Sequence, residues 1–257
     1  MAAPSILTLR DLTKLELPDG PPDEPKYAAW VDAAVSAALE IVHSLAPSHL
    51  TEHWSKGKVH HGAQTYTSRS TSNPPPGAGD TCGFKWHVRQ SRHDASAELS
   101  YEQFERGLLR DHSTNEQKYI ESCTEARQIE VLKPGELEIW QTLYHLPFPA
   151  ANRDFAFVIL TVPVPPGSET HAEPVPLRSF LVISIPVAHP TESGYTRGKY
   201  VSVEHVAERP DGQIEWTMAV SSDPAGMVPK LISEKSMPSK ISEDVPSFIQ
   251  WARKEYA

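Results

Sequence analysis

Apolar side chains recur every three or four residues in two stretches of the chain, and this spacing predicts two helices. The first covers residues 27–46 and ends before Pro47. The second covers residues 228–252, where Pro238 and Pro246 interrupt the pattern. A proline inside a helix removes one hydrogen bond and costs about 3 kcal/mol. We therefore expect either one kinked helix or two abutting helices in the second stretch.

The residues around the second stretch indicate how this helix begins and what it contacts. Asp223, Pro224 and Gly226 form a turn signal. Pro229 suits the first helical turn, where a missing N–H does no harm, and Asp244 is expected to cap the second of two abutting helices. A helix with one apolar stripe must bury that stripe, and strands precede it. The simplest arrangement is one long helix across one curved sheet, with a space between them.

Alternating apolar and polar residues predict strands in much of the remaining chain. The expected strands cover residues 58–70, 83–91, 126–132, 136–145, 154–164, 180–188, 199–207 and 214–221. One or two short helices are expected over residues 100–122, where Ser100 and Gln103 form a capping box. Turn signals at residues 133–135 and 210–212 join consecutive strands as hairpins. This order favours an antiparallel sheet with helices to one side, an α+β fold.

The chain divides into a lead-in, residues 1–26, and a single domain, residues 27–257, and its composition limits the class of partner. The net charge of −9 argues against nucleic acid as the main partner, because phosphate binding needs clustered Lys and Arg. Cys82 and Cys123 are too few for a disulfide scaffold and fit reduced thiols in a cytoplasmic protein. The sequence has neither a transmembrane run of about 18 apolar residues nor a signal-peptide pattern.

One group of polar residues lies on an expected strand. Arg89, Ser91 and His93 alternate along it, so their side chains point the same way. If that face is the inner one, Arg89 and His93 are suited to hold an acidic or phenolic oxygen, and His93 to move a proton near neutral pH. The alternative is an outward polar face.

A second group lies on an expected short helix. His112, Glu116 and Tyr119 stand at positions i, i+4 and i+7, on one helix face. A His–Glu pair beside a Tyr is suited to proton transfer. The alternative is a surface ion pair, which contributes only about 0.3–0.5 kcal/mol.

A third group joins two expected strands. Arg153 and Asp154 are adjacent on a strand and must point in opposite directions. An arginine in the interior needs a partner, because an unpaired buried charge is very destabilising. Glu204, which shares a strand face with Tyr200 and Ser202, is the expected partner. The pair would either contact a ligand or serve as a structural salt bridge.

Aromatic residues and methionines are expected to line the core or the space beneath the C-terminal helix. The residues that we expect to contact a ligand are Trp86, Trp140, Tyr144, Arg153, Tyr200, Glu204, Trp216, Met218 and Met227. The sequence contains 12 histidines but no HExxH or CxxC spacing, so no metal site is expected. It also lacks nucleotide-binding glycine motifs, so no cofactor is expected. A GxSxG elbow is absent, but residue spacing leaves Ser-His-Asp catalysis open.

Several stretches of the sequence resemble the START-like lipid-transfer superfamily, also called helix-grip proteins, and within it a fungal START-like family of unassigned function. These stretches are WHVRQSRH at residues 86–93, YEQFERGLLRDHSTNEQKYI at 101–120, PFPAANRDF at 147–155, RGKYVSVEHV at 197–206 and EWTMAVSSDPAGMVPKLISEKSMPSKISEDVPSFIQW at 215–251. The resemblance implies a curved antiparallel sheet wrapped around a long C-terminal helix, enclosing a cavity for one hydrophobic molecule. It supplies neither a substrate nor catalytic residues.

Three functions remain open on this basis. The first is a carrier or binding module for a lipid, a sterol or a natural-product intermediate. The second is a cofactor-independent cyclase or isomerase of fungal secondary metabolism, with acid–base residues drawn from His93, Arg89, Tyr119, Glu116 and His112. The third is a lipid-sensing interaction module. We expect a hydrophobic small molecule as partner and no obligate protein partner, and transient contact with a membrane stays open.

Overall fold

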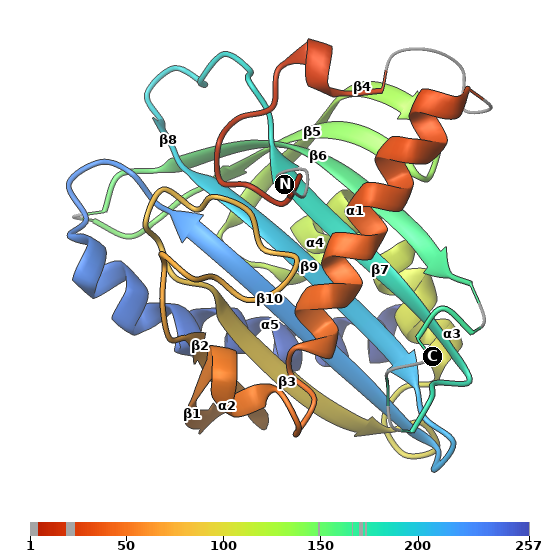
Figure 1. Ribbon diagram of the computed structural model, residues 1–257. Coiled ribbons are helices and arrows are strands. Elements are labelled where there is room, and N and C mark those ends of the chain that lie inside the picture. Colours follow the sequence, from red (N-terminus) through yellow and green to blue (C-terminus); the bar gives the residue numbers. More distant parts are fainter. Residues whose placement is uncertain are drawn as a thin grey trace.

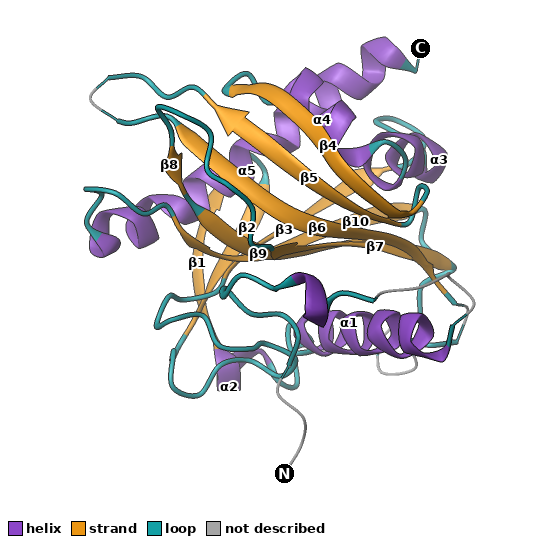
Figure 2. Ribbon diagram, turned by 90° about the horizontal axis from the view of Figure 1, so that it is seen from above, coloured by secondary structure: helices purple, strands orange, loops and turns teal. Residues whose placement is uncertain are grey.

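The computed structural model describes residues 5–18, 24–148, 150–165, 167–169, 172 and 174–256. A ten-stranded sheet forms the central layer of this part of the chain (Figure 1). Helix α1 (Pro25–His43) covers one face of the sheet, and α5 (Lys230–Glu255) crosses the other face (Figure 2). Three short elements share the α5 side: α3 (Tyr101–Phe104), the π-helical segment η2 (Glu105–Leu109) and α4 (His112–Tyr119).

Neighbouring strands along the sheet are antiparallel, as expected. Their order is β1 (Trp54–His60), β2 (Ala63–Ser68), β3 (His87–Asp94), β10 (Gln213–Asp223), β9 (Lys199–Glu208), β7 (Arg178–Pro186), β6 (Arg153–Val164), β5 (Leu137–Tyr144) and β4 (Cys123–Lys133). The short β8 (Thr196–Arg197) pairs with β6 in parallel. Helix α2 (Leu50–His53) and the 3-10 turn η1 (Lys14–Glu16) complete the elements. The curved sheet and the helix across it confirm the α+β, helix-grip fold.

The strand expected over residues 58–70 is a hairpin of two strands, β1 and β2. His61 and Gly62 form its turn with φ angles of 49° and 81°, and positive φ at both positions matches the twist of a two-residue hairpin turn. His-Gly is a weaker turn signal than Asn-Gly or Asp-Gly, and this hid the reversal. The capping box of Ser100 and Gln103 is present as predicted.

Helix α5 is one helix from Lys230 to Glu255, with Pro238 and Pro246 inside it. The expectation of two abutting helices with Asp244 as a cap is therefore wrong, and Pro229 is the N-cap residue rather than part of the first turn. The apolar stripe explains this result. Its members on both sides of Pro246 are buried: Ile241, Val245, Phe248 and Ala252. Their burial outweighs the loss of single helical hydrogen bonds.

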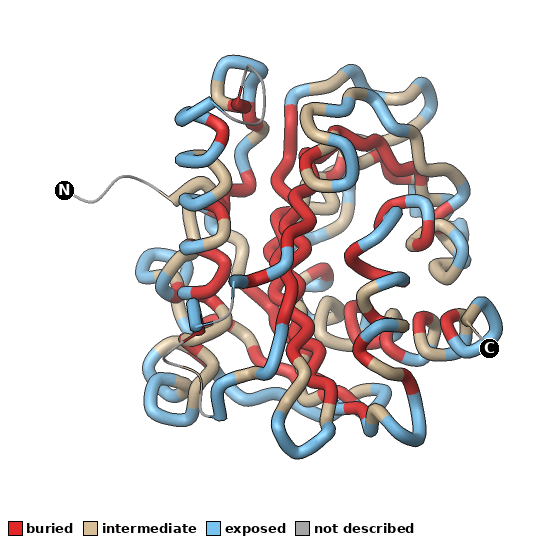
Figure 3. Tube along the Cα trace, turned by 90° about the vertical axis from the view of Figure 1, so that its right-hand side faces the viewer, coloured by how far each residue is buried: buried red, intermediate tan, exposed pale blue. Residues whose placement is uncertain are grey.

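Two apolar cores lie on the two faces of the sheet, and the sheet itself is the most continuously buried layer (Figure 3). One core joins α1 to the sheet, and the lead-in adds Leu7, Leu9 and Leu12 to it. Leu12 also forms a bridge to Val187, next to β7. The second core joins α5, α3 and η2 to the opposite face. Within the described residues, no helix is long and apolar enough to cross a membrane.

Candidate functional site

Three neighbouring strands beneath α5 place an arginine, a methionine and a glutamate side by side in one row. Strand pairing aligns Arg89 of β3 with Met218 of β10, and Met218 with Glu204 of β9. Trp216 precedes Met218 by two residues and belongs to the α5-side core, so this row faces α5. The structure thus turns Arg89, and with it His93, inward.

Arg89 is completely buried and connects the sheet to the helix. Its Nε donates a hydrogen bond to the carbonyl oxygen of Ile241 on α5, 2.7 Å away. Its Nη2 lies 3.6 Å from a carboxylate oxygen of Glu204, and its guanidinium stacks 3.8 Å from the centre of the Trp216 ring. The buried Nη1 has no hydrogen-bond partner among the described residues. One strong donor of Arg89 is therefore available to a bound molecule.

Glu204 is the buried carboxylate of this row, and it collects several donors. The Trp216 Nε1 donates to it at 2.8 Å, and the His112 Nε2 lies 3.8 Å from its other oxygen. The His112 Nδ1 donates to the carbonyl oxygen of Leu108, which fixes the ring. Glu204 and Arg89 thus form the charged centre of the α5 side.

The partner expected for Glu204 was Arg153, and this expectation is wrong. Arg153 lies at the start of β6, and its Nε donates to the carbonyl oxygen of Pro224 at 2.6 Å. Asp154 points to the opposite face and binds Arg197 at 2.9 Å. Arg153 therefore holds the turn that leads into α5, while Arg89 pairs with Glu204. The strand register decides this, and the spacing within each strand does not reveal it.

The residues that were predicted to share one helix face lie on the inward face of α4. His112 and Tyr119 both reach the α5-side interior, and Glu116 lies between them. The Tyr144 hydroxyl donates to a Glu116 carboxyl oxygen at 3.5 Å. Asp244 of α5 lies close enough to influence the charge of Glu116.

Burial changes the protonation of the two acids at this site. It raises the pKa of Glu116 to about 8, and the nearby charges of Glu204 and Asp244 act in the same direction. Burial likewise raises the pKa of Asp244 to about 7, although Arg89 opposes this shift. Glu116 therefore keeps its proton at neutral pH and is able to act as a hydrogen-bond donor.

Several side chains around this charged centre retain accessible surface although they point inward. They are Glu116, Tyr119, Tyr144, Phe155, Tyr200, Met218 and Asp244. Burial is the largest cause of the raised pKa of each of the five titratable members. We infer from the surface that these strongly desolvated groups retain that they border a space between the sheet, α4 and α5. We call the space that they border the interior hollow.

The wall of the interior hollow is largely aromatic. The Phe155 ring packs against Tyr144 and Tyr200, with ring centres 5.5 and 5.4 Å apart. Tyr119 packs against Phe248 of α5, with ring centres 5.5 Å apart. The hollow thus combines an apolar wall with a few polar groups, which is typical of a site for a small organic molecule.

Other residues expected at a ligand site lie elsewhere. Trp86 precedes β3 and belongs to the core on the α1 side of the sheet. Met227 lies in the turn before α5 and is 98% exposed. Trp140 is buried on the α5 side, where its Nε1 donates to Glu138 at 2.9 Å. Sequence reasoning missed Asp244 as a site residue, although an acid three residues after Ile241, next to the apolar stripe, was a usable signal.

His93 lies beyond the interior hollow, in a separate groove. Its ring packs against Phe104, with ring centres 5.4 Å apart, and Phe104 packs in turn against Trp216. Trp216 also contacts Arg89, so these two aromatic side chains connect His93 to Arg89. The catalytic set proposed from the sequence therefore divides into two places, with His93 in one and Arg89, His112, Glu116 and Tyr119 in the other.

Comparison with solved structures matches the fold. The chain is similar to human StAR-related lipid transfer protein 5, with a TM-score of 0.65, 13% identity and coverage of 88% of this chain and 98% of that one. It is also similar to human STARD10, with a TM-score of 0.59, 14% identity and coverage of 79% and 77% of the two chains. At these identities the likeness shows the START helix-grip fold.

Comparison of sequences gives the family. The chain is 26% identical over 242 residues to Uncharacterized protein C577.11 of Schizosaccharomyces pombe, which covers 91% of this chain and 89% of the relative. Residues 86–252 match the model of the family described as "Protein of unknown function (DUF3074)". The matched residues contain the strands β3 to β10, the short helices α3 and α4, and α5 up to Ala252. The chain therefore belongs to the DUF3074 family, and its fold is that of START domains.

Proposed function

We propose that the protein binds one hydrophobic small molecule in the interior hollow, as a carrier or binding module. The observation that carries this proposal is the buried Nη1 of Arg89, a donor without a partner among the described residues, beside a largely aromatic wall. The solved structures of similar fold include proteins named for lipid transfer, and this supports the proposal. A lipid, a sterol or a natural-product intermediate fits these requirements.

The charges around the hollow indicate the chemistry of the polar end of the ligand. Glu204 already offsets the charge of Arg89, and Glu116 keeps its proton up to a pH of about 8. An anionic head group would add an unbalanced charge in a dry site, which is costly. A hydroxyl or carbonyl oxygen would accept from Arg89 without this penalty. We therefore propose an uncharged, oxygen-bearing head group.

Burial of the apolar part of the ligand supplies the affinity. A molecule that buries about 300–500 Å² of apolar surface gains roughly 8–12 kcal/mol. The loss of translational and rotational freedom takes back several kcal/mol or more, so binding in the micromolar to nanomolar range is expected.

Native mass spectrometry of the purified protein tests the proposal directly, because a bound lipid adds a discrete mass. Titration with a fluorescent sterol and a fluorescent fatty acid then compares an uncharged head with a carboxylate. Met218→Trp fills the hollow and should weaken sterol binding by at least ~10-fold, the equivalent of about 1.4 kcal/mol. Val59→Trp adds the same ring at an exposed strand position and serves as the control. Equal binding by both variants would contradict the proposal.

A specific observation favours a second function for the same hollow, that of a cofactor-independent cyclase or isomerase. Glu116 is an acid that stays protonated near neutral pH, and the Tyr144 hydroxyl lies 3.5 Å from it. A positioned acid of this kind accelerates proton transfer by roughly 10²–10⁴. Glu116→Gln should then abolish turnover of a bound polyketide-like substrate while binding persists. If the wild type binds such compounds without converting them, the carrier function stands alone.

A further inference from the structure

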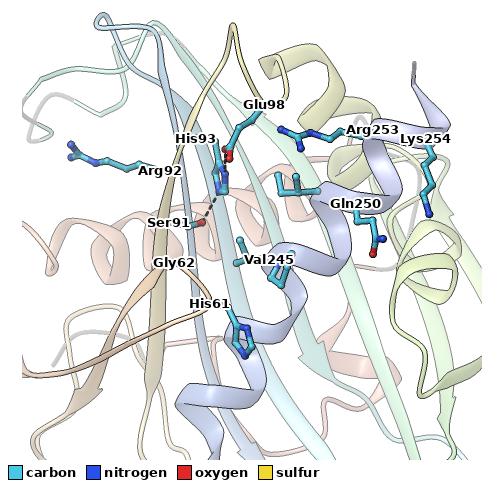
Figure 4. Close-up of a pocket in the computed structure, with 12 residues that line it drawn as sticks. His61, Gly62, Ser91, Arg92, His93, Glu98, Val245, Gln250, Arg253 and Lys254 are labelled. Atoms are coloured by element: carbon cyan, nitrogen blue, oxygen red, sulfur yellow. Dashed lines mark hydrogen bonds and ion pairs between the residues drawn. The ribbon is translucent and has the colours of Figure 1, made fainter.

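A groove separate from the interior hollow lies between β3 and the C-terminal half of α5 (Figure 4). It has a volume of about 510 Å³, and the β1–β2 turn at His61 and Gly62 forms part of its rim. Val245, Gln250 and Arg253 of α5 line the facing side. We call this space the outer groove.

Three side chains in the outer groove form a continuous hydrogen-bonded relay, drawn with dashed lines in Figure 4. The Ser91 Oγ lies 2.9 Å from the His93 Nε2, and the His93 Nδ1 lies 2.7 Å from a carboxylate oxygen of Glu98. An ionised carboxylate only accepts hydrogen bonds, so Nδ1 carries the proton and Nε2 is free to accept from the serine hydroxyl. The Ser91 hydroxyl also lies 3.4 Å from the Trp216 carbonyl oxygen, a longer contact.

The local backbone holds these three groups in place. Ser91 and His93 are two residues apart on β3, so they share its α5 face. Glu98 follows a tight turn in which the Asp94 carboxylate accepts from the backbone N–H of Ser96 at 2.8 Å. The backbone N–H of Glu98 donates to the Asp94 carbonyl oxygen, also at 2.8 Å. The relay is therefore built into the end of β3.

We propose that the outer groove is an acyl-transfer site in which Ser91 cleaves a small carboxylic ester. A hydroxyl nucleophile, a histidine base and a carboxylate that orients the histidine are the parts that this chemistry requires. Arg253 lines the same groove, and its guanidinium lies on the side of the relay residues, where it supplies N–H donors for the developing oxyanion (Figure 4). Arg253 and Lys254 favour an ester whose other end carries a negative charge.

The reaction balances without a cofactor. The Ser91 oxygen attacks the ester carbonyl carbon while its proton passes to the His93 Nε2. The carbon–oxygen bond to the alcohol breaks, and the alcohol leaves with that proton. Water then attacks the acyl-serine, again giving a proton to His93, and the acid leaves as Ser91 regains its hydrogen. One ester and one water yield one acid and one alcohol.

The surroundings of His93 support its role as the base. Burial lowers the pKa of His93 below that of an ordinary histidine, although the hydrogen bond to Glu98 acts in the opposite direction. A neutral imidazole is the form that accepts a proton from serine. Ser91 is only 3% exposed, so a substrate has to reach it through the groove.

A fluorophosphonate probe tests the site in the full-length protein, because it modifies only activated serines. Mass spectrometry of the digested protein should place the adduct on Ser91. Ser91→Ala and His93→Gln should each lower labelling and p-nitrophenyl acetate hydrolysis by at least ~100-fold. Ser55→Ala removes an exposed hydroxyl from edge strand β1 and should leave both unchanged. Absence of an adduct on Ser91 of the wild type, or labelling that survives Ser91→Ala, overturns the proposal.

Glu98 acts through His93 and is a positioning residue. Glu98→Gln should lower hydrolysis at least ~10-fold with the melting temperature unchanged, because the histidine loses its orienting charge. Glu98→Asp keeps the carboxylate and should recover part of the rate. Equal activity of both variants and the wild type would show that the Glu98 contact is only structural. None of these measurements requires a ligand in the interior hollow.

Discussion

Arg89 is the residue on which the packing of α5 and the chemistry of the interior hollow both depend. Its loss would leave Glu204 buried without its cation, which typically costs 3–5 kcal/mol. We predict that Arg89→Met lowers the free energy of unfolding by about 3 kcal/mol or more in urea denaturation. Arg89→Met with Glu204→Met should recover part of this loss, since no unpaired charge remains. A double variant as unstable as the single one would mean that the contact with Ile241 dominates instead.

The raised pKa values of Glu116 and Asp244 predict how the stability of the protein depends on pH. Glu116 titrates near its ordinary value of 4.5 when unfolded and near 8 when folded, and Asp244 near 3.8 and 7. Between these limits the folded state holds protons that the unfolded state has released. The free energy of unfolding should therefore fall as pH rises from about 4 to 8, by at most about 1.4 kcal/mol per pH unit for each proton.

Glu116→Gln is the variant that checks this dependence, because glutamine cannot titrate. Urea denaturation at several pH values should show a shallower fall for Glu116→Gln than for the wild type. Glu121→Gln changes an exposed glutamate in the adjacent segment and provides the matched control. A slope that is the same in all three proteins would place Glu116 in contact with bulk water.

At the scale of single residues, the sequence predicts contacts within one element but not contacts between side chains on different elements. Helical spacing predicted that His112, Glu116 and Tyr119 share a face, since that depends on one element alone. The pairing of Arg89 with Glu204 depends on how β3, β10 and β9 align, and no local pattern reveals that register. The same limit hid the contact between Tyr144 and Glu116.

Contact between η2 and α5 depends on a glycine. A Cβ atom at Gly107 would lie 2.6 Å from the Phe248 ring and 3.3 Å from Trp251. Because Phe248 is fully buried among aromatic neighbours, its ring has little room to move. We predict that Gly107→Ala lowers the free energy of unfolding by about 1–3 kcal/mol, as overpacking does. Thermal denaturation measures this effect.

A second variant separates overpacking from a backbone effect at Gly107. Phe248→Leu makes a smaller side chain at the contact, so Gly107→Ala should be tolerated better in that background. If the cost of Gly107→Ala is the same with Phe248 and with Leu at that position, the Cβ contact is not its cause.

Helices and strands were predicted correctly where the spacing of apolar residues matched a single element. The prediction failed where the same alternation continued through a hairpin turn. The stripe of Ile241, Val245 and Phe248 continues through Pro246, so burial preserves one helix where local propensity left two abutting helices open. Alternation also continues through the turn at His61 and Gly62, so one strand was expected where two occur. Tertiary burial and turn geometry decide these cases, and neither is a local property.

The architecture of the whole molecule followed from the order of its elements. Helix, strands, short helices, six strands and a final helix leave few arrangements other than an antiparallel sheet beneath that helix. The resemblance of residues 197–206 and 215–251 to START-like proteins made the same fold explicit. The position of the N-terminal segment was not predicted, because the contacts of Leu7 and Leu9 with the α1-side core span most of the sequence.

One end of the molecule exposes apolar side chains from two separate segments. Phe148 follows β5, and Met227 and Leu231 lie at the start of α5, with exposed fractions of 96%, 98% and 78%. Arg153 joins these segments, because it lies next to the first and binds the carbonyl oxygen of Pro224 before the second. Both segments lie at the same end of the sheet (Figure 1). We call this set of residues the apolar end.

From the apolar end and the net charge of −9 we predict a preference for uncharged over anionic membranes. An acidic protein is repelled by anionic lipids. Exposed Phe, Met and Leu side chains lower the free energy when they enter a lipid interface, whatever the charge of the lipid. Binding to vesicles of uncharged phosphatidylcholine should therefore equal or exceed binding to phosphatidylserine vesicles in a flotation assay. Phe148→Ser with Leu231→Ser should weaken it by at least ~10-fold, because about 1.5–3 kcal/mol of burial is lost at each position.

The matched control for this prediction changes two exposed valines outside the apolar end. Val59→Ser with Val131→Ser removes apolar surface from edge strands β1 and β4, where the exposed fractions are 63% and 43%. This double variant should bind vesicles as the wild type does, since β1 and β4 are the two outer strands of the sheet and neither carries a residue of the apolar end. If both double variants weaken vesicle binding equally, binding depends on the total exposed apolar surface and not on the apolar end. If neither does, the apolar end is not the surface that contacts the vesicle.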